Sequence, residues 1–243
     1  AQVPGPFDWV VNTVSAGGGG VAEYREVYWK GTRHSIEWLE PTPLAKYVYT
    51  SSPGAYGQTE SLEVNETSPT VPDTETGQVL LDTENLLLAA QRKSGFPAVI
   101  LRVAGIYGPG RGYWFRQYSS GRAVIEGDGN RILNMIHREG HRFVILAALE
   151  KGVPGEIYNA VDDEPVTQRA YFQWLSERLG KAMPPSVPQI TLSGRNRGRS
   201  NKRVLNAKLK AALDYAFKYA TFRQGCAAEI ARLVETGALP RAG

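Results

Sequence analysis

Two segments, residues 47–57 and 101–111, constrain the fold more than any other part of this chain. The first reads YVYTSS and continues into PGAYG, and the second reads LRVAGIYGPGR. Each is a β-rich run that stops abruptly in small, turn-forming residues. In an open α/β sheet, ligands bind at the carboxyl ends of the strands. The two strand ends therefore predict a binding cleft.

The pattern around these segments predicts alternating strands and helices. An apolar run at residues 7–14 predicts a buried strand, and strands are also expected at 47–50 and 98–103. Apolar residues at helical spacing predict helices at 21–40 and 78–93 between them. The order β-α-β-α-β, with long crossovers, predicts parallel strands in a doubly wound α/β sheet.

The second half of the chain has a looser pattern, which predicts a mixed α+β arrangement. Short strands are expected at 132–136 and 156–160, helices at 139–151, 167–180, 206–217 and 222–236, and loops at 57–76 and 190–201.

Composition is ordinary for a globular protein of 243 residues with one main core. No apolar run approaches ~18 residues, so no membrane helix or membrane partner is expected. The amino terminus lacks the charge and apolar run of a signal peptide. It also lacks an initiating Met, which leads us to expect a truncated chain. The lone Cys226 excludes an intrachain disulfide and is compatible with a cytoplasmic location.

Positive charge is concentrated in one segment. Residues 195–210 contain seven Lys and Arg residues and no acid, so the remainder of the chain is net negative although the whole carries +4. The loop at 195–203 has no interleaved aromatic residues for base stacking, so nucleic acid is not an expected partner. Contact with an anionic substrate is one alternative, and a solvated loop that covers the cleft or contacts a neighbour is the one that we favour.

A run of glycines at residues 17–20 allows two interpretations. Residues 17–22 match the pattern G-x-G-x-x-A between a strand and a helix, which is the fingerprint of a phosphate-binding loop. The fingerprint also requires an acidic residue at the end of the next strand, where this chain has Ser51-Ser52. A flexible strand-to-helix turn is the alternative that we favour.

Four motifs together resemble the extended short-chain dehydrogenase/reductase superfamily, specifically its NAD-dependent epimerase/dehydratase family. They are Ser-Ser-x-x-x-Tyr-Gly at 51–57, Asn-Glu-Thr-Ser-Pro at 65–69, Arg-x-x-x-Ile-Tyr-Gly-Pro-Gly-Arg at 102–111 and Asn-Met-Ile-His at 134–137. The resemblance aligns strand 7–14 with the family's fourth strand.

This resemblance implies a particular domain organisation. Residues 1–110 would form a partial NAD(P)-binding, Rossmann-like domain without the family's first βαβ unit. Residues 111–243 would form a mixed α+β substrate-binding lobe that is interleaved with the sheet. The glycine turn would then follow the fourth strand rather than form the pyrophosphate site.

The resemblance also exposes a chemical departure. The family's catalytic Tyr-x-x-x-Lys pair falls on Thr76 and Leu80. Threonine has no accessible pKa for acid/base work, and leucine carries no charge. Of the usual catalytic set, only the serine position remains, as Ser52.

Carried over position by position, the family's sites fall on residues of three kinds. The candidate catalytic residues are Ser52 and Tyr56. The candidate cofactor-binding residues are Thr13, Val14, Ser15, Thr50, Ser51, Gly105, Ile106 and Tyr107. The candidate substrate-binding residues are Arg111, Arg116, Asn134 and His137. For each group the alternative is a structural role in a turn, a cap or packing. The three histidines lack metal-ligand spacing, and no metal site is expected.

The resemblance implies an NAD(P)-dependent, epimerase/dehydratase-like protein that acts on a sugar or nucleotide-sugar-like small molecule. NAD or NADP would bind weakly, or not at all, to this chain alone. The alternative is a non-catalytic binding or scaffold module with the same fold. We also expect a homodimer through the helices at 21–40 and 78–93, and self-association through the open edge of strand 7–14.

Overall fold

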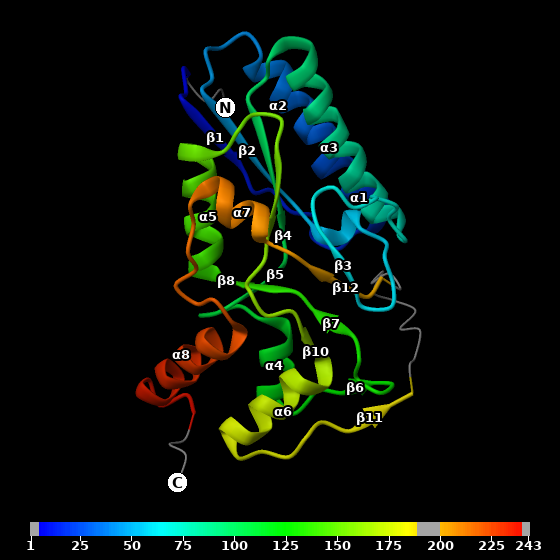
Figure 1. The fold of residues 1–243 in the computed structure, drawn as a ribbon, viewed down its shortest axis with the longest axis vertical. Coiled ribbons are helices and arrows are strands. Elements are labelled where there is room, and N and C mark those ends of the chain that lie inside the picture. Colours follow the sequence, from blue (N-terminus) through cyan, green and yellow to red (C-terminus); the bar gives the residue numbers. More distant parts are fainter. Residues whose placement is uncertain (1–4, 189–199, 240–243) are drawn as a thin grey trace.

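The computed structural model describes residues 5–188 and 200–239. Its largest sheet has parallel strands in the order β1-β2-β4-β9 (Figure 1). These strands are β1 (Trp9–Asn12), β2 (Lys46–Ser51), β4 (Ala98–Val103) and β9 (Ile157–Ala160). Parallel pairing with intervening helices confirms the predicted α/β fold class.

Helices cover both faces of this sheet. On one side lie α1 (Gly20–Tyr24), the π-helical turn η1 (Arg25–Lys30), α2 (Gly31–Leu39) and α3 (Glu75–Ser94), and on the other lie α5 (Arg138–Lys151) and α7 (Ala207–Leu213). Side chains of β2 alternate between the two faces. Tyr47 and Tyr49 pack in the cluster that contains Leu87 of α3, whereas Val48 packs in the cluster that contains Val144 of α5. This alternation explains why the run is apolar throughout.

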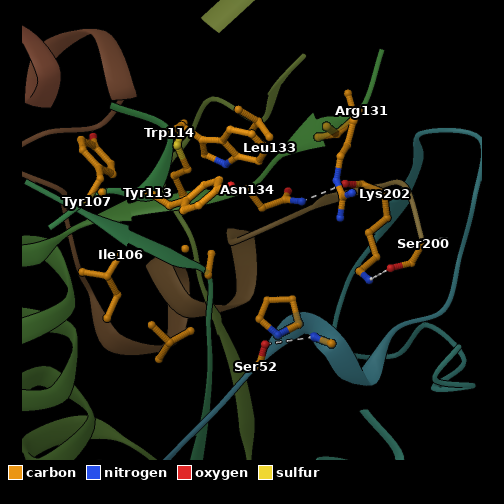
Figure 2. A pocket seen from close by; sticks show the side chains of 18 of the residues that line it. Ser52, Ile106, Tyr107, Tyr113, Trp114, Arg131, Leu133, Asn134, Ser200 and Lys202 are labelled. Atoms are coloured by element: carbon orange, nitrogen blue, oxygen red, sulfur yellow. Dashed lines mark hydrogen bonds between the residues drawn. The ribbon is translucent and has the colours of Figure 1, made fainter. Parts of the chain in front are cut away.

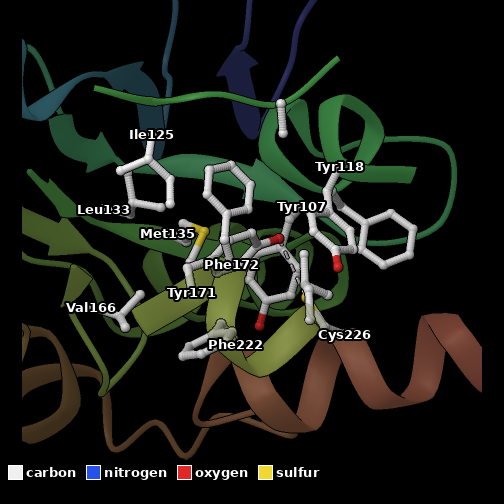
Figure 3. Close-up of a cluster of buried hydrophobic side chains, with 13 residues drawn as sticks. Tyr107, Tyr118, Ile125, Leu133, Met135, Val166, Tyr171, Phe172, Phe222 and Cys226 are labelled. Carbon is white, nitrogen blue, oxygen red and sulfur yellow. Dashed lines mark hydrogen bonds between the residues drawn. The ribbon is translucent and has the colours of Figure 1, made fainter. Parts of the chain in front are cut away.

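Short strand pairs and three further helices complete the fold. The pairs are β5 (Gly105–Tyr107) with β8 (Met135–His137), β7 (Ile132–Leu133) with β10 (Val166–Thr167), β6 (Ile125–Glu126) with β11 (Ser186–Val187), and β3 (Leu62–Val64) with β12 (Lys202–Val204). The helices are α4 (Tyr113–Ser119), α6 (Gln168–Leu179) and α8 (Phe222–Glu235). They surround a third buried cluster, in which the rings of Tyr171 and Phe222 lie 5.1 Å apart (Figure 3).

Local sequence explains where α3, the longest helix described, begins and ends. Thr74 is its N-cap, since Thr74 Oγ1 accepts a hydrogen bond from Gly77 N at 3.0 Å. Gly95 ends it in the left-handed conformation, with φ of 74°. The first turns of α3 are thereby fixed beside the 3₁₀ helix η2 (Pro53–Ala55), which follows β2.

Several expectations need correction. The strand predicted as buried at 7–14 is β1, which is shorter and lies at the edge of the sheet, so Trp9 is 50% exposed. The predicted strand at 132–136 is two strands, β7 and β8, separated by Asn134. The predicted loop at 57–76 contains β3. Most of the loop predicted at 190–201 lies outside the described residues.

Candidate functional site

A cavity of about 810 Å³ opens where β2 and β4 end. Its volume is in the range of small-molecule sites, roughly 300–1,000 Å³. Its walls come from the segments after β2 and β4, the start of α3, α4 and the strand β12 (Figure 2). The cavity therefore lies at the carboxyl edge of the sheet, where the sequence predicts a cleft.

Ser52, Thr76 and Leu80 all line this cavity. Ser52 caps η2, because Ser52 Oγ accepts a hydrogen bond from Gly54 N at 3.2 Å. Thr76 Oγ1 lies 3.3 Å from Thr74 Oγ1, and the Leu80 side chain is 6% exposed. The wall beside Ser52 thus presents a hydroxyl and an aliphatic chain at the two positions where the family resemblance implies tyrosine and lysine.

The segment after β4 forms the adjoining wall through Gly105, Ile106 and Tyr107. A Cβ on Gly105 would approach Asn134 O at 3.3 Å, so glycine permits the close pairing of β5 with β8. Tyr107 Oη donates a hydrogen bond to Thr221 O at 3.2 Å. Burial raises the pKa of Tyr107, so this phenol is unsuited to proton transfer near neutral pH.

Three of the four predicted substrate-binding residues line the cavity: Arg111, Arg116 and Asn134. The Asn134 amide holds β12 in place, since Nδ2 donates to Lys202 O at 2.9 Å and Oδ1 accepts from Val204 N at 2.9 Å. His137 lies away from the cavity lining. It is buried and caps α5 through a hydrogen bond from Glu139 N to its Nδ1.

Tyr56, Thr50 and Ser51 lie outside the cavity lining and make hydrogen bonds within the fold. Tyr56 Oη donates to Asn159 Oδ1 at 3.0 Å, and burial raises the pKa of this phenol. Thr50 Oγ1 donates to Asn12 O at 3.1 Å, and Ser51 Oγ donates to Glu84 Oε1 at 2.5 Å. None of these hydroxyls is presented to a ligand in the cavity.

The glycine loop at 17–20 binds the chain's own carboxylate. The amides of Gly17, Gly18 and Gly19 all donate hydrogen bonds to the side chain of Glu23, and these bonds lower the pKa of Glu23. The amides that a pyrophosphate would need are thus already paired, and the loop does not fit that role. Nearby, Thr13, Val14 and Ser15 are exposed and lie outside the cavity lining.

Lys202 and Arg131 line the cavity as well, and Arg131 was not among the predicted site residues. The expectation that the basic segment at 195–203 covers the cleft agrees with the place of Lys202, whereas the expectation of a solvated loop is wrong there, because Lys202 lies in β12 and is only 7% exposed. The strand that pairs with β12 is β3, far away in the sequence. No local pattern marks the lysine as buried.

Within the described ranges, no group of three or more His, Cys, Asp or Glu side chains is arranged to hold a metal ion. Within the same residues, no helix is long and apolar enough to cross a membrane.

The model of the NAD dependent epimerase/dehydratase family matches residues 4–160. The chain belongs to this family. The cavity described above is thus a cleft in an epimerase/dehydratase fold, and the resemblance drawn from the four motifs is confirmed.

Sequence relatives are distant and longer. Protein YeeZ of Escherichia coli (strain K12) is 27% identical over 183 residues, which are 74% of this chain and 63% of that protein. The human dTDP-D-glucose 4,6-dehydratase is 27% identical over 149 residues, 56% of this chain and 40% of the enzyme. The chain therefore spans less than two thirds of the length of these relatives.

Solved structures share the fold over nearly the whole chain. A functionally unknown conserved protein from Silicibacter pomeroyi DSS has a TM-score of 0.77 and 26% identity, covering 95% of this chain and 80% of its own. The dTDP-glucose 4,6-dehydratase of Bacillus anthracis, solved in complex with NAD, has a TM-score of 0.80 and 21% identity. The match covers 95% of this chain and 74% of that enzyme. At that identity the second match establishes the fold alone.

Proposed function

We propose that this protein binds a nicotinamide cofactor and a sugar or nucleotide-sugar-like small molecule in the cavity at the end of β2 and β4. The family supports the cofactor, and the NAD complexes among similar structures support NAD in particular. In this proposal residues 1–110 hold the cofactor and residues 111–243 contribute the substrate lobe. Ser52 and Gly105 fit the nicotinamide end, because a small side chain and a glycine leave room for a flat ring there, and Ile106 adds an apolar side chain to the same wall.

Arg111 and Arg116 support an anionic substrate. Both line the cavity with exposed side chains, and guanidinium groups bind phosphate or carboxylate through paired hydrogen bonds. A nucleotide sugar carries such groups. NAD, when bound, supplies a hydride acceptor, while Ser52 of this chain would donate a hydrogen bond to a substrate oxygen.

The observation that carries this proposal is that Ser52, Thr76 and Leu80 line one cavity. They form the family's catalytic corner with its acid/base pair replaced. The test is fluorescence titration of the protein with NADH and NADPH, followed by hydride-transfer assays with UDP-glucose, UDP-glucuronic acid and dTDP-glucose. Because weak binding or none is expected of this chain alone, failure of the full-length protein to bind either NADH or NADPH would remove the proposal.

A non-catalytic module is the second candidate. It is favoured by Leu80, whose side chain cannot lower the pKa of a neighbouring acid as a lysine would. The same assays separate the two candidates. Cofactor binding without turnover on any sugar nucleotide supports the module, whereas robust turnover excludes it.

We also propose that the protein forms a homodimer through the helical segment at 21–40, which contains α1, η1 and α2, and through α3. Trp38 of α2 is 50% exposed, which supports an apolar contact there.

We further propose a cytoplasmic location. The lone Cys226 is buried, which is compatible with a reducing cytoplasm.

A further inference from the structure

Lys202 has an unusual environment for a lysine. Its side chain extends from β12 towards the segment that follows Ser52 (Figure 2). Its ammonium group donates one hydrogen bond to the carbonyl oxygen of Tyr56 and another, of 3.0 Å, to Ser200 Oγ. An ammonium group has three donors. Among the described residues the third donor has no partner, and Lys202 lines the cavity, so this donor faces the space that a ligand would occupy.

Among the described residues, Lys202 has no partner in an ion pair. The residues outside the described ranges, 1–4, 189–199 and 240–243, contain no Asp or Glu. A buried charge without a partner is unfavourable, and an anion from outside the chain relieves that cost.

Other charged groups around Lys202 do not remove this imbalance. Arg131, which lines the same cavity, adds positive charge and its nearest carboxylate is Glu126 at 3.7 Å. Asp73 is exposed, and its Oδ2 accepts a hydrogen bond from Ser200 N at 2.7 Å. On the paired strand β3, Glu63 is exposed and lies opposite Arg203 rather than Lys202.

We propose that Lys202 binds an anionic group of the ligand in this cavity, a phosphate or a carboxylate, and takes up a proton as that group binds. The inference rests on the proposed function, since it assumes a sugar-nucleotide-like ligand. It adds a specificity-determining residue and a proton that is linked to binding.

The pKa of Lys202 is lowered to about 8, chiefly by burial; the negative charge of Asp73 opposes this shift, and the positive charge of Arg131 adds a smaller lowering. Near pH 8, about half of the free protein therefore lacks this proton. An anion beside the amine favours its charged form, so binding raises the pKa and draws a proton from solvent. Affinity should then fall as pH rises above 8, by up to about tenfold per pH unit.

The test is isothermal titration calorimetry of the protein at pH 8 in two buffers with different ionisation enthalpies. The probes are UDP, UDP-glucose and UDP-glucuronic acid. The wild type should take up about half a proton per ligand bound. Lys202→Arg should bind without proton uptake, because guanidinium stays charged. Lys202→Met should bind about tenfold or more weakly, and the exposed control Lys93→Met should match the wild type.

The probes identify the group that Lys202 binds. Proton uptake on binding of UDP shows that Lys202 binds a phosphate. Proton uptake with UDP-glucuronic acid, but not with UDP or UDP-glucose, shows that Lys202 binds a carboxylate. Binding without proton uptake in the wild type overturns the inference and leaves the proposed function standing. Absence of binding of all three probes overturns this inference, whereas the proposed function falls with it only if the cofactors also fail to bind. If Lys202→Met does not fold, the wild type and Lys202→Arg still decide the question.

Discussion

At the scale of single residues, the pair Arg102–Glu84 is the ion pair with the least solvent exposure among the described residues. Arg102 Nη2 lies 2.6 Å from Glu84 Oε2, and both side chains are 2% exposed or less. Arg102→Met leaves a buried carboxylate without its partner, so we expect a loss of about 3–5 kcal/mol in the free energy of unfolding. Urea denaturation of the wild type and the variant measures this loss. Lys30→Met, which breaks the exposed pair with Glu26, should cost under about 1 kcal/mol. Equal losses would contradict the prediction.

Asp162 is a buried carboxyl group that should make stability depend on pH. It is 1% exposed; its Oδ1 accepts a hydrogen bond from Glu164 N at 3.2 Å, while its Oδ2 has no partner. Burial raises the pKa of Asp162 well above 3.8. The folded state therefore holds this proton to higher pH than the unfolded state. The stability that this proton contributes is lost as pH rises from the ordinary pKa through the raised one.

Asp162→Asn removes that titration. Relative to the wild type, the variant should gain stability as pH rises from 5 towards 8, by up to about 1.4 kcal/mol per pH unit inside the window between the two pKa values. Urea denaturation at several pH values measures the difference. Asp214→Asn, at a side chain that is 92% exposed, is the control. Parallel pH profiles for Asp162→Asn and the wild type would show that Asp162 is ionised in both states.

At the scale of elements, α3 shows how glycine sets the spacing around the site. A Cβ on Gly77 would lie 2.7 Å from Gly54 O and 2.9 Å from Pro72 Cβ. Gly77→Ala should therefore push α3 away from η2, destabilise the protein by about 1–3 kcal/mol and weaken ligand binding beside Ser52. Thermal unfolding and NADH titration measure both effects.

Gly31 provides the matched control. It is helical, with φ of −58°, and the nearest atom to an added Cβ is 3.7 Å away. Gly31→Ala should stabilise the protein by about 0.5–1 kcal/mol, because alanine loses less backbone freedom on folding. A stabilising Gly77→Ala would show that the contact between α3 and η2 is loose.

The sequence predicts elements whose signals are local. The alternating apolar strand β2 and the helix α3, which ends at Gly95, follow from neighbouring residues, and motif spacing brings Ser52, Thr76 and Leu80 to one place. Contacts between distant segments are different. The pairing of β3 with β12, which buries Lys202, depends on the whole fold and leaves no local pattern. For the same reason the edge position of β1 could not be read from its apolar residues.

At the scale of the whole molecule, the main sheet has an unpaired edge. Within the described residues, β1 pairs only with β2, and Trp9, Val11 and Val14 are 50%, 39% and 58% exposed. An edge strand offers free backbone donors and acceptors to another chain. The edge and the proposed dimer contact at Trp38 are two routes to self-association that lie near each other, since the rings of Trp38 and Phe7, two residues before β1, are 5.8 Å apart.

Substitutions at the two surfaces separate these routes in the 243-residue chain. We expect self-association that increases with concentration in light scattering, because β1 pairs with an edge from a second copy. Val11→Lys places a charge on the edge and should shift the protein towards monomer. Val153→Lys, at an equally apolar residue that is 54% exposed and lies outside the sheet, between α5 and β9, is the control. If Trp38→Glu restores the monomer and Val11→Lys does not, association runs through the helices. A wild type that stays monomeric at all concentrations would contradict both routes.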